Sequence, residues 1–191
     1  MTVGWRHVAA ALLMIVAPAK AGAQSPASVK LCEACHGPGG NSAIAGTPSI
    51  AAQPPTFIEN SLVYFREGLR NSPVMQGVAK GMKDEDITAL AKHFSAQPAK
   101  VVSTGPTIAA KADKGREVAS RNHCGQCHLS KYEGRDQMPR LAGQREEYLY
   151  AAMIGYRDGK RSAADTTMTE VLYGMSDADI DALAHFMARA E

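Results

Sequence analysis

Aromatic residues are scarce in this chain. They make up 6% of its 191 residues, and the single tryptophan, Trp5, lies near the amino terminus. Hydrophobic residues (45%) and charged residues (21%) are at the levels of a soluble globular protein, which excludes a disordered, collagen-like or coiled-coil chain. A chain with so few aromatic side chains must fill its core in another way, or with a group that is not protein.

The sequence also lacks a hydrophobic run long enough to cross a membrane. The apolar run at Val8–Ala17 has about ten residues, whereas a spanning helix needs about 20. It follows Arg6 and precedes Ala21-Gly22-Ala23, which fits an A-x-A cleavage site. This layout predicts a secretory signal peptide over residues 1–23 and an exported protein with no transmembrane segment after cleavage. An uncleaved amino-terminal anchor is the alternative.

Neither sign of charge is in large excess. The chain has 21 basic and 19 acidic side chains, and removal of residues 1–23 takes two of the basic ones, Arg6 and Lys20. Basic and acidic groups then balance. No basic patch indicates nucleic acid as a partner, and no cluster of lysine and arginine indicates a membrane surface.

Cysteine occurs four times, always inside the pattern C-x-x-C-H, at residues 32–36 and 124–128. Two thiols at this spacing can form thioethers with the two vinyl groups of a haem, and the adjacent histidine can then bind the iron. Two copies predict two covalently bound haem c groups. The residues that would hold them are Cys32, Cys35, His36, Cys124, Cys127 and His128.

Two other cysteine chemistries explain the sequence less well. A thioredoxin-like C-x-x-C site lies in a βαβ pattern, and no such pattern is visible here. A zinc site formed by all four cysteines would leave the two adjacent histidines unexplained.

The two motifs belong to an internal repeat. Cys32 and Cys124 are 92 residues apart, and other matched stretches have an offset of 91, namely 48–53 with 139–144 and 66–70 with 157–161. We therefore predict two tandem domains, residues 24–100 and 101–191. Residues 97–106, which are rich in proline, serine, threonine and glycine, are predicted to form an extended linker.

Apolar residues recur at helical spacing and no segment alternates like a strand, so the predicted fold is all-α. Helices are expected from about Thr56 to Gly68, and at about 84–95, 109–120 and 177–190. Thr56 with Glu59 predicts a capping box, and Ser176 predicts a second amino-terminal cap. A domain of about 80 residues has a marginal protein core, which a buried haem would complete.

The sixth ligand of each iron decides what the haem can do. A methionine or histidine closes the iron, whereas an open position would suit gas binding or peroxidase chemistry. The candidates are Met75 and Met82 in the first copy, and Met138, Met153, Met168, Met175 and Met187 in the second. The repeat pairs Met75 with Met168 and Met82 with Met175.

Helix-start patterns separate these two pairs of methionines. Met175 directly precedes the predicted cap of the last helix and would form a hydrophobic staple with Ile180. Met82 has the corresponding position in the first copy. Met75 and Met168 lie seven residues earlier, in segments predicted to be loops with no packing pattern. We therefore expect Met75 and Met168 to be the axial ligands.

The remaining histidines of the exported chain are not expected to bind iron. His123 directly precedes Cys124, so its backbone is fixed beside the haem. His93 and His185 lie on the predicted final helices, where a surface or core position is the ordinary one for histidine.

Taken together, these features resemble the dihaem c4-type cytochromes c over nearly the whole exported chain. The resemblance rests on the two C-x-x-C-H motifs and on residues 37–42, 139–144, 157–161 and 168–180. It implies two class I cytochrome c domains packed as a pseudo-symmetric pair, with Met75 and Met168 as axial ligands. It also implies a periplasmic electron carrier, not an enzyme, between a quinol-oxidising cytochrome bc complex and terminal acceptors such as a terminal oxidase.

The sequence departs from that family pattern in two places. Only eight residues, Gln24–Leu31, separate the predicted cleavage point from Cys32, and Leu129 follows the second motif where Gly37 follows the first. The short lead also resembles the dihaem subunit of flavocytochrome c sulfide dehydrogenases. The alternative function is therefore an electron-transfer subunit that serves a flavoprotein dehydrogenase. A haem enzyme with an open iron is a third hypothesis, which the presence of both methionines disfavours.

Overall fold

The structure is a computed structural model that describes residues 1, 26–102, 105–161 and 166–191. The predicted signal peptide therefore lies outside the described residues, apart from Met1. Within these ranges the chain forms nine α-helices and one short 3-10 helix, and no β-strand. The predicted all-α fold is confirmed. No helix in the described part of the chain is long and apolar enough to cross a membrane.

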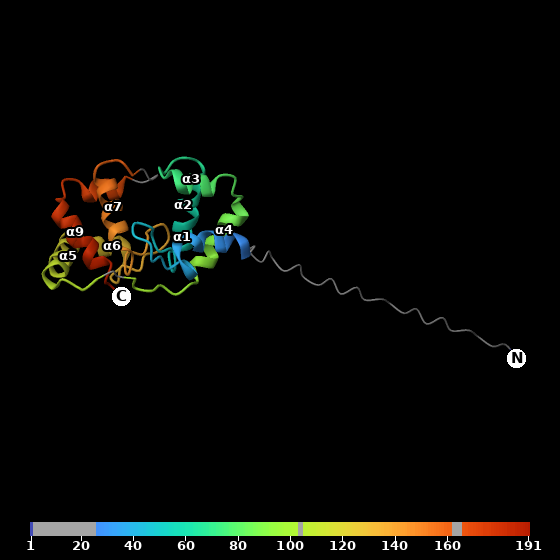
Figure 1. The fold of residues 1–191 in the computed structure, drawn as a ribbon, viewed down its shortest axis with the longest axis horizontal. Helices are drawn as coiled ribbons and strands as arrows, with labels where there is room; N and C mark the ends of the chain where they lie inside the picture. The colour runs from blue at the N-terminus through green and yellow to red at the C-terminus, as the bar shows by residue number, and fades with distance from the viewer. Residues whose placement is uncertain (2–25, 103–104, 162–165) are drawn as a thin grey trace.

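The helices form two sets that follow the internal repeat (Figure 1). The first half contains α1 (Pro26–His36), the 3-10 helix η1 (Pro38–Gly40), α2 (Pro55–Arg66), α3 (Pro73–Ala79) and α4 (Asp84–Ser95). The second half contains α5 (Ala109–Arg121), α6 (Cys124–His128), α7 (Glu146–Arg157), α8 (Thr167–Leu172) and α9 (Asp177–Met187). Figure 1 shows the two halves side by side, with α2 and α7 facing each other across the middle.

The predicted helix caps are half right. The hydroxyl of Ser176 caps α9 as expected, because its Oγ accepts a hydrogen bond from the backbone N–H of Asp179 at 3.1 Å. The predicted capping box at Thr56 is wrong: α2 begins at Pro55, and its first residues receive no side-chain cap. Proline has no N–H to satisfy and its fixed φ suits a first helical position, so the helix begins one residue before Thr56.

Each half has its own hydrophobic core. In the first half α2 packs against α4, and the buried cluster consists of Ile58, Leu62, Ile87, Leu90, Ala91 and Phe94. In the second half α9 packs against both α5 and α7, and the cluster consists of Val118, Ala119, Leu149, Leu183, Ala184, Met187 and Ala188. The helices α5 and α9 approach closely at Gly115, where a Cβ atom would lie 2.2 Å from the carbonyl oxygen of Ala182.

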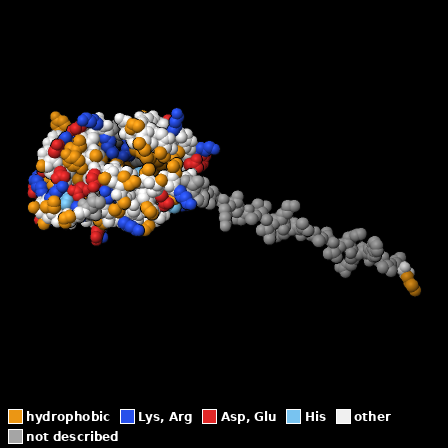
Figure 2. Space-filling view, in the orientation of Figure 1, with side chains coloured by type: hydrophobic (Ala, Val, Ile, Leu, Met, Phe, Trp, Pro, Cys, Tyr) orange, Lys and Arg blue, Asp and Glu red, His pale blue; other side chains and the backbone are white. Residues whose placement is uncertain are grey.

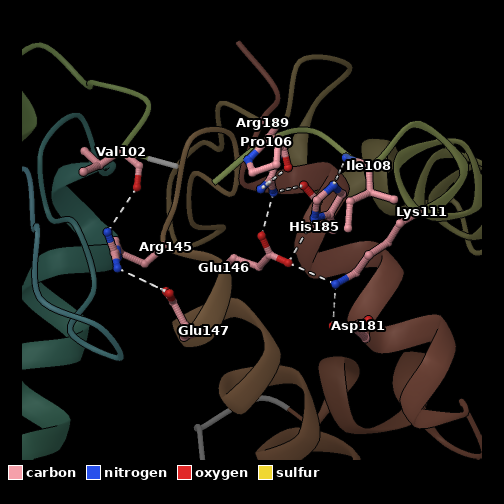
Figure 3. A network of polar contacts seen from close by, with 10 residues as sticks. All are labelled: Val102, Pro106, Ile108, Lys111, Arg145, Glu146, Glu147, Asp181, His185 and Arg189. Carbon is pink, nitrogen blue, oxygen red and sulfur yellow. Dashed lines mark hydrogen bonds and ion pairs between the residues drawn. The ribbon is translucent and has the colours of Figure 1, made fainter. Parts of the chain in front are cut away.

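A polar network joins the beginning of α7 to α5 and α9 (Figure 3). His185 is 2% exposed, and its Nε2 accepts a hydrogen bond from the N–H of Ile108 at 3.0 Å. Its Nδ1 therefore carries the proton, and this N–H donates a hydrogen bond to Glu146 Oε1 at 3.1 Å. Lys111 and Arg189 also bind the Glu146 carboxylate, at 3.1 and 2.6 Å. His185 is thus a core residue with both ring nitrogens occupied.

The two halves are joined by two matched sets of hydrogen bonds. The side chain of Gln53 binds the backbone of Arg140, and the side chain of Gln144 binds the backbone of Ser49. Both glutamines are buried. Each residue on one side has its counterpart 91 positions away on the other side, so the contact obeys the pseudo-symmetry of the repeat.

Candidate haem-binding sites

Both C-x-x-C-H motifs lie on helices. The first ends α1, and the second forms α6. Residues three and four apart share one face of a helix, so each motif presents its two thiols and its imidazole to the same side. Cys32 and Cys124 pack against the cores of their halves, whereas Cys35 and Cys127 are exposed, and all four thiols are free. Burial raises the pKa of the Cys32 and Cys124 thiols.

The two motif histidines are buried and oriented in the same way. His36 is 8% exposed and His128 is 5% exposed. The Nδ1 atom of His36 lies 2.8 Å from the carbonyl oxygen of Pro48, and that of His128 lies 2.8 Å from the carbonyl oxygen of Pro139. A carbonyl can only accept, so Nδ1 carries the proton and Nε2 keeps its lone pair for a metal. Burial lowers the pKa of both imidazoles, which favours the neutral form that binds iron.

The residues present therefore suit a covalently bound haem better than a bare metal ion. Each site offers two unpaired thiols and one neutral, buried imidazole, which is the set that the haem attachment reaction requires. No group of three or more histidine, cysteine, aspartate or glutamate side chains in the described part of the chain could hold a metal ion. Among the described residues, the four cysteines are therefore not gathered into one cluster.

Met75 and Met168 lie on short helices, α3 and α8, rather than in the loops that the sequence predicted. Pro73 at the first turn and Ser72 as cap begin α3, and the Ser72 hydroxyl accepts from the N–H of Met75 at 3.5 Å. Helices of six or seven residues are too short for apolar periodicity to reveal them. Both methionines are half-buried, and Met75 packs against the core of the first half. Their roles as axial ligands stay predictions.

Met82 and Met175 behave as packing residues. Met82 packs against the cluster that contains Ile87, and Met175 packs against the core of the second half. Each directly precedes the cap residue of a helix, α4 or α9. This is the position expected for the outer member of a hydrophobic staple.

The turn after the second motif keeps the backbone of the first despite its different residue. Gly37 has φ 78° and ψ 166°, and Leu129 has φ 67° and ψ 166°. Glycine adopts this region freely, whereas a residue with a Cβ is strained there. The loops beyond differ in sequence, yet both return a proline carbonyl to the motif histidine. The second haem site thus accepts backbone strain to keep the same geometry.

Sequence reasoning missed the polar residues where the halves meet. Gln53, Gln144, Arg70 and Arg161 all lie in the matched stretches of the repeat, which is the signal that could have found them. Arg70 and Arg161 both donate to the hydroxyl of Tyr148, at 3.0 and 2.8 Å. No carboxylate among the described residues pairs with either arginine. Figure 2 shows basic side chains within the hollow between the halves.

The arginines also change the acidity of Tyr148. Burial alone would raise the pKa of this phenol, but the positive charges of Arg161 and Arg70 outweigh burial and lower it to about 8. The guanidinium groups of Arg70, from the first half, and Arg161, from the second half, thus meet at the Tyr148 hydroxyl.

Comparison with known proteins decides the family. The family model described as cytochrome c matches residues 112–191. A protein named thiosulfate dehydrogenase electron acceptor, from Thiomonas intermedia, is 35% identical over 177 residues, which cover 87% of this chain and 81% of that protein. The chain belongs to the cytochrome c family. Two solved structures resemble this cytochrome over most of its length, including both halves.

The first is reduced recombinant cytochrome c4 from Pseudomonas stutzeri, with a TM-score of 0.78 and 27% identity, covering 88% of this chain and 100% of that chain. The second is a thiosulfate dehydrogenase from Marichromatium purpuratum, with a TM-score of 0.74 and 25% identity, covering 84% of this chain and 36% of that longer chain. This cytochrome therefore has two tandem cytochrome c domains with two covalently bound haem c groups, and its function is electron transfer. The predictions of a tandem fold, of two haem c groups and of electron transfer are thus confirmed.

Proposed function

We propose that this cytochrome accepts electrons in the periplasm from a dehydrogenase of the thiosulfate dehydrogenase type and passes them singly to a respiratory acceptor. The observation that carries the proposal is the 35% identity to a thiosulfate dehydrogenase electron acceptor over 87% of this chain. The likeness to part of a longer thiosulfate dehydrogenase chain supports the same role.

The protein's contribution to this transfer is a fixed environment. The haem groups supply one-electron chemistry, in which iron alternates between Fe(III) and Fe(II). Cys32, Cys35, Cys124 and Cys127 would attach them, and the side chains of His36, Met75, His128 and Met168 would bind the iron. Backbone carbonyls hold the buried imidazoles of His36 and His128 in one orientation, which would limit the reorganisation that accompanies electron transfer.

Two other electron-transfer roles, with different partners, are also candidates. A carrier between a quinol-oxidising cytochrome bc complex and a terminal oxidase is favoured by the TM-score of 0.78 to cytochrome c4, whose chain is covered completely. An electron-transfer subunit of a flavoprotein dehydrogenase is favoured by the short segment before Cys32. The predicted domains, residues 24–100 and 101–191, belong to all of these proposals.

The proposal is tested by reduction of the purified, oxidised holoprotein. Catalytic amounts of a purified thiosulfate dehydrogenase with thiosulfate should raise the ferrous haem c absorption, and omission of thiosulfate or of the enzyme should abolish the rise. A parallel reaction contains a cytochrome bc complex and quinol, and a third contains a flavoprotein sulfide dehydrogenase with sulfide. Rapid reduction in either parallel reaction, with none by the thiosulfate dehydrogenase, would overturn the proposal in favour of that candidate.

A further inference from the structure

The hydrogen bonds that join the halves end beside the haem-binding histidines. In the first site, Gln144 of the second half accepts from the N–H of Ser49 through Oε1 at 2.7 Å. Its Nε2 donates to the carbonyl oxygen of Ser49 at 2.8 Å. The N–H of Ser49 belongs to the same peptide group as the carbonyl of Pro48, which accepts from His36 Nδ1 at 2.8 Å. One peptide group therefore separates Gln144 from the histidine of the other half.

The second site repeats this arrangement in the opposite direction. The N–H of Arg140 donates to Oε1 of Gln53 at 2.9 Å, and Nε2 of Gln53 donates to the carbonyl oxygen of Arg140 at 2.9 Å. That N–H shares a peptide group with the carbonyl of Pro139, which accepts from His128 Nδ1 at 2.8 Å. The glutamine of the first half thus reaches the histidine of the second.

A hydrogen bond at the N–H of a peptide group affects the C=O of the same group, because the two are conjugated. When the N–H donates to a glutamine oxygen, the carbonyl oxygen becomes a better acceptor, since hydrogen bonds in a chain polarise one another. A stronger hydrogen bond at Nδ1 fixes the imidazole ring and raises its basicity as a metal ligand. Gln53 and Gln144 are 4% and 5% exposed, so water screens neither contact.

We propose that Gln53 and Gln144 are positioning residues that act crosswise, each tuning the axial histidine of the opposite half. The reduction potential of each haem then depends on the docking of the other half. The proposal rests on the electron-transfer function and on His36 and His128 as iron ligands, but not on which protein is the partner.

The test is a redox titration of the holoprotein followed by NMR, in which each haem is assigned through its own thioether cysteines. Gln144→Leu should weaken the hydrogen bond at His36 and favour Fe(II) at the first haem. At a fixed ambient potential, the ratio of reduced to oxidised first haem should rise by about threefold or more, as expected for a weakened buried hydrogen bond. The second haem should change less. Gln53→Leu should give the mirror result, with the larger change at the second haem.

A second substitution distinguishes a change in this hydrogen bond from a separation of the two halves. Gln144→Glu keeps an acceptor for the N–H of Ser49 and makes it negative, so the first haem should move towards Fe(III), opposite to the effect of leucine and by more than the second haem. Hydrodynamic radius shows whether the halves stay docked in each variant. Changes confined to the haem of the substituted half, equal changes in both haems, or no change would overturn the proposal. None of these outcomes depends on a dehydrogenase, so they are independent of the test of the proposed function.

Discussion

At the scale of single residues, Leu129 is strained by the conformation that the second haem site imposes. Its φ of 67° with ψ of 166° lies in a region that is essentially restricted to glycine and costs about 1–3 kcal/mol for other residues. Ordinarily, glycine is less stable than alanine at a structured position by about 0.5–1 kcal/mol. The strain at Leu129 should reverse that order.

We therefore predict that Leu129→Gly unfolds with a free energy about 1 kcal/mol higher than Leu129→Ala. Both variants lack the leucine side chain, so their difference isolates the backbone. Denaturant titration of the oxidised holoprotein measures it. Alanine more stable than glycine at this position would show that no strain is stored there. Gly37→Ala is the matched substitution in the first half and should be destabilising, because its Cβ would lie 2.1 Å from the carbonyl oxygen of Asn41.

The axial ligands give the second prediction at this scale. Met168→Ala should remove the weak charge-transfer absorption of Fe(III)–S(Met) at the second haem and lower its potential, because a methionine ligand favours Fe(II). Met175→Ala should keep that absorption. It should instead lower the free energy of unfolding. Truncation of a fully buried methionine costs about 2–5 kcal/mol, and the loss here should be smaller because Met175 is only half-buried. Loss of the absorption in Met175→Ala instead would reverse the assignment.

The candidate site was predictable from sequence only where side chains carry the chemistry. Residue type and spacing identify Cys32, Cys35 and His36 in the sequence. The partner of His36 is the backbone carbonyl of Pro48, twelve residues further along the chain. Every residue has such a carbonyl, so no residue type could reveal which one folds back onto the ring.

At the scale of helices, the carboxylate of Glu146 holds α5, α7 and α9 together (Figure 3). Burial alone would raise the pKa of Glu146, but hydrogen bonds from Arg189, His185 and Lys111 outweigh burial and lower it to about 2. A carboxyl group whose pKa is lowered on folding stabilises the protein at pH values above the pKa that the group has in the unfolded chain. That stability is lost as the pH falls through the folded pKa.

We predict that Glu146→Gln lowers the free energy of unfolding near pH 7 by about 2–3 kcal/mol, the size expected for a shift of this extent in a partly screened group. The difference from the wild type should shrink as the pH falls from about 4.5 to about 2, because the native carboxylate becomes protonated. Denaturant titrations across this pH range measure it. Glu117→Gln, in an exposed ion pair, should have little effect at any pH. A difference that stays constant with pH would contradict the role of the charge.

The crossing of α5 and α9 gives another prediction at this scale. Gly115→Ala should lower the free energy of unfolding by about 1–3 kcal/mol, because the added methyl group would overlap the carbonyl oxygen of Ala182 in a tightly packed contact. Gly77→Ala in α3 is the control, since nothing lies within 4 Å of the added Cβ. It should be neutral or stabilising by up to about 1 kcal/mol. Thermal unfolding distinguishes the two, and a neutral Gly115→Ala would mean that the helices can separate without cost.

Helices were predictable where they are long and amphipathic. The segment predicted at 84–95 coincides with α4, and that at 109–120 falls one residue short of the end of α5. The segment predicted at 177–190 extends beyond α9, which ends at Met187. The short helices α3 and α8 depend on tertiary contacts with α2 and α7, which local sequence does not encode.

At the scale of the whole molecule, the internal repeat explains both the number of haem sites and the way in which the halves meet. The offset between the motifs predicts two domains. It does not reveal that the matched stretches 48–53 and 139–144 lie opposite each other, because a repeat specifies similar units and leaves their docking open. The buried glutamines in these stretches hold the two halves in this arrangement. Their hydrogen bonds to backbone groups of the other half can be seen only in the three-dimensional structure.

The central claim is that one exported chain carries two haem c groups, each attached through one C-x-x-C-H motif. Intact-mass spectrometry of the protein purified from the periplasm, under denaturing conditions, tests this claim most directly. We predict a chain that begins near Gln24 and whose mass includes two haems, because thioether bonds survive unfolding. Replacement of Cys124 and Cys127 by serine should remove one haem and leave the other. A wild-type mass with one haem or none would contradict the account.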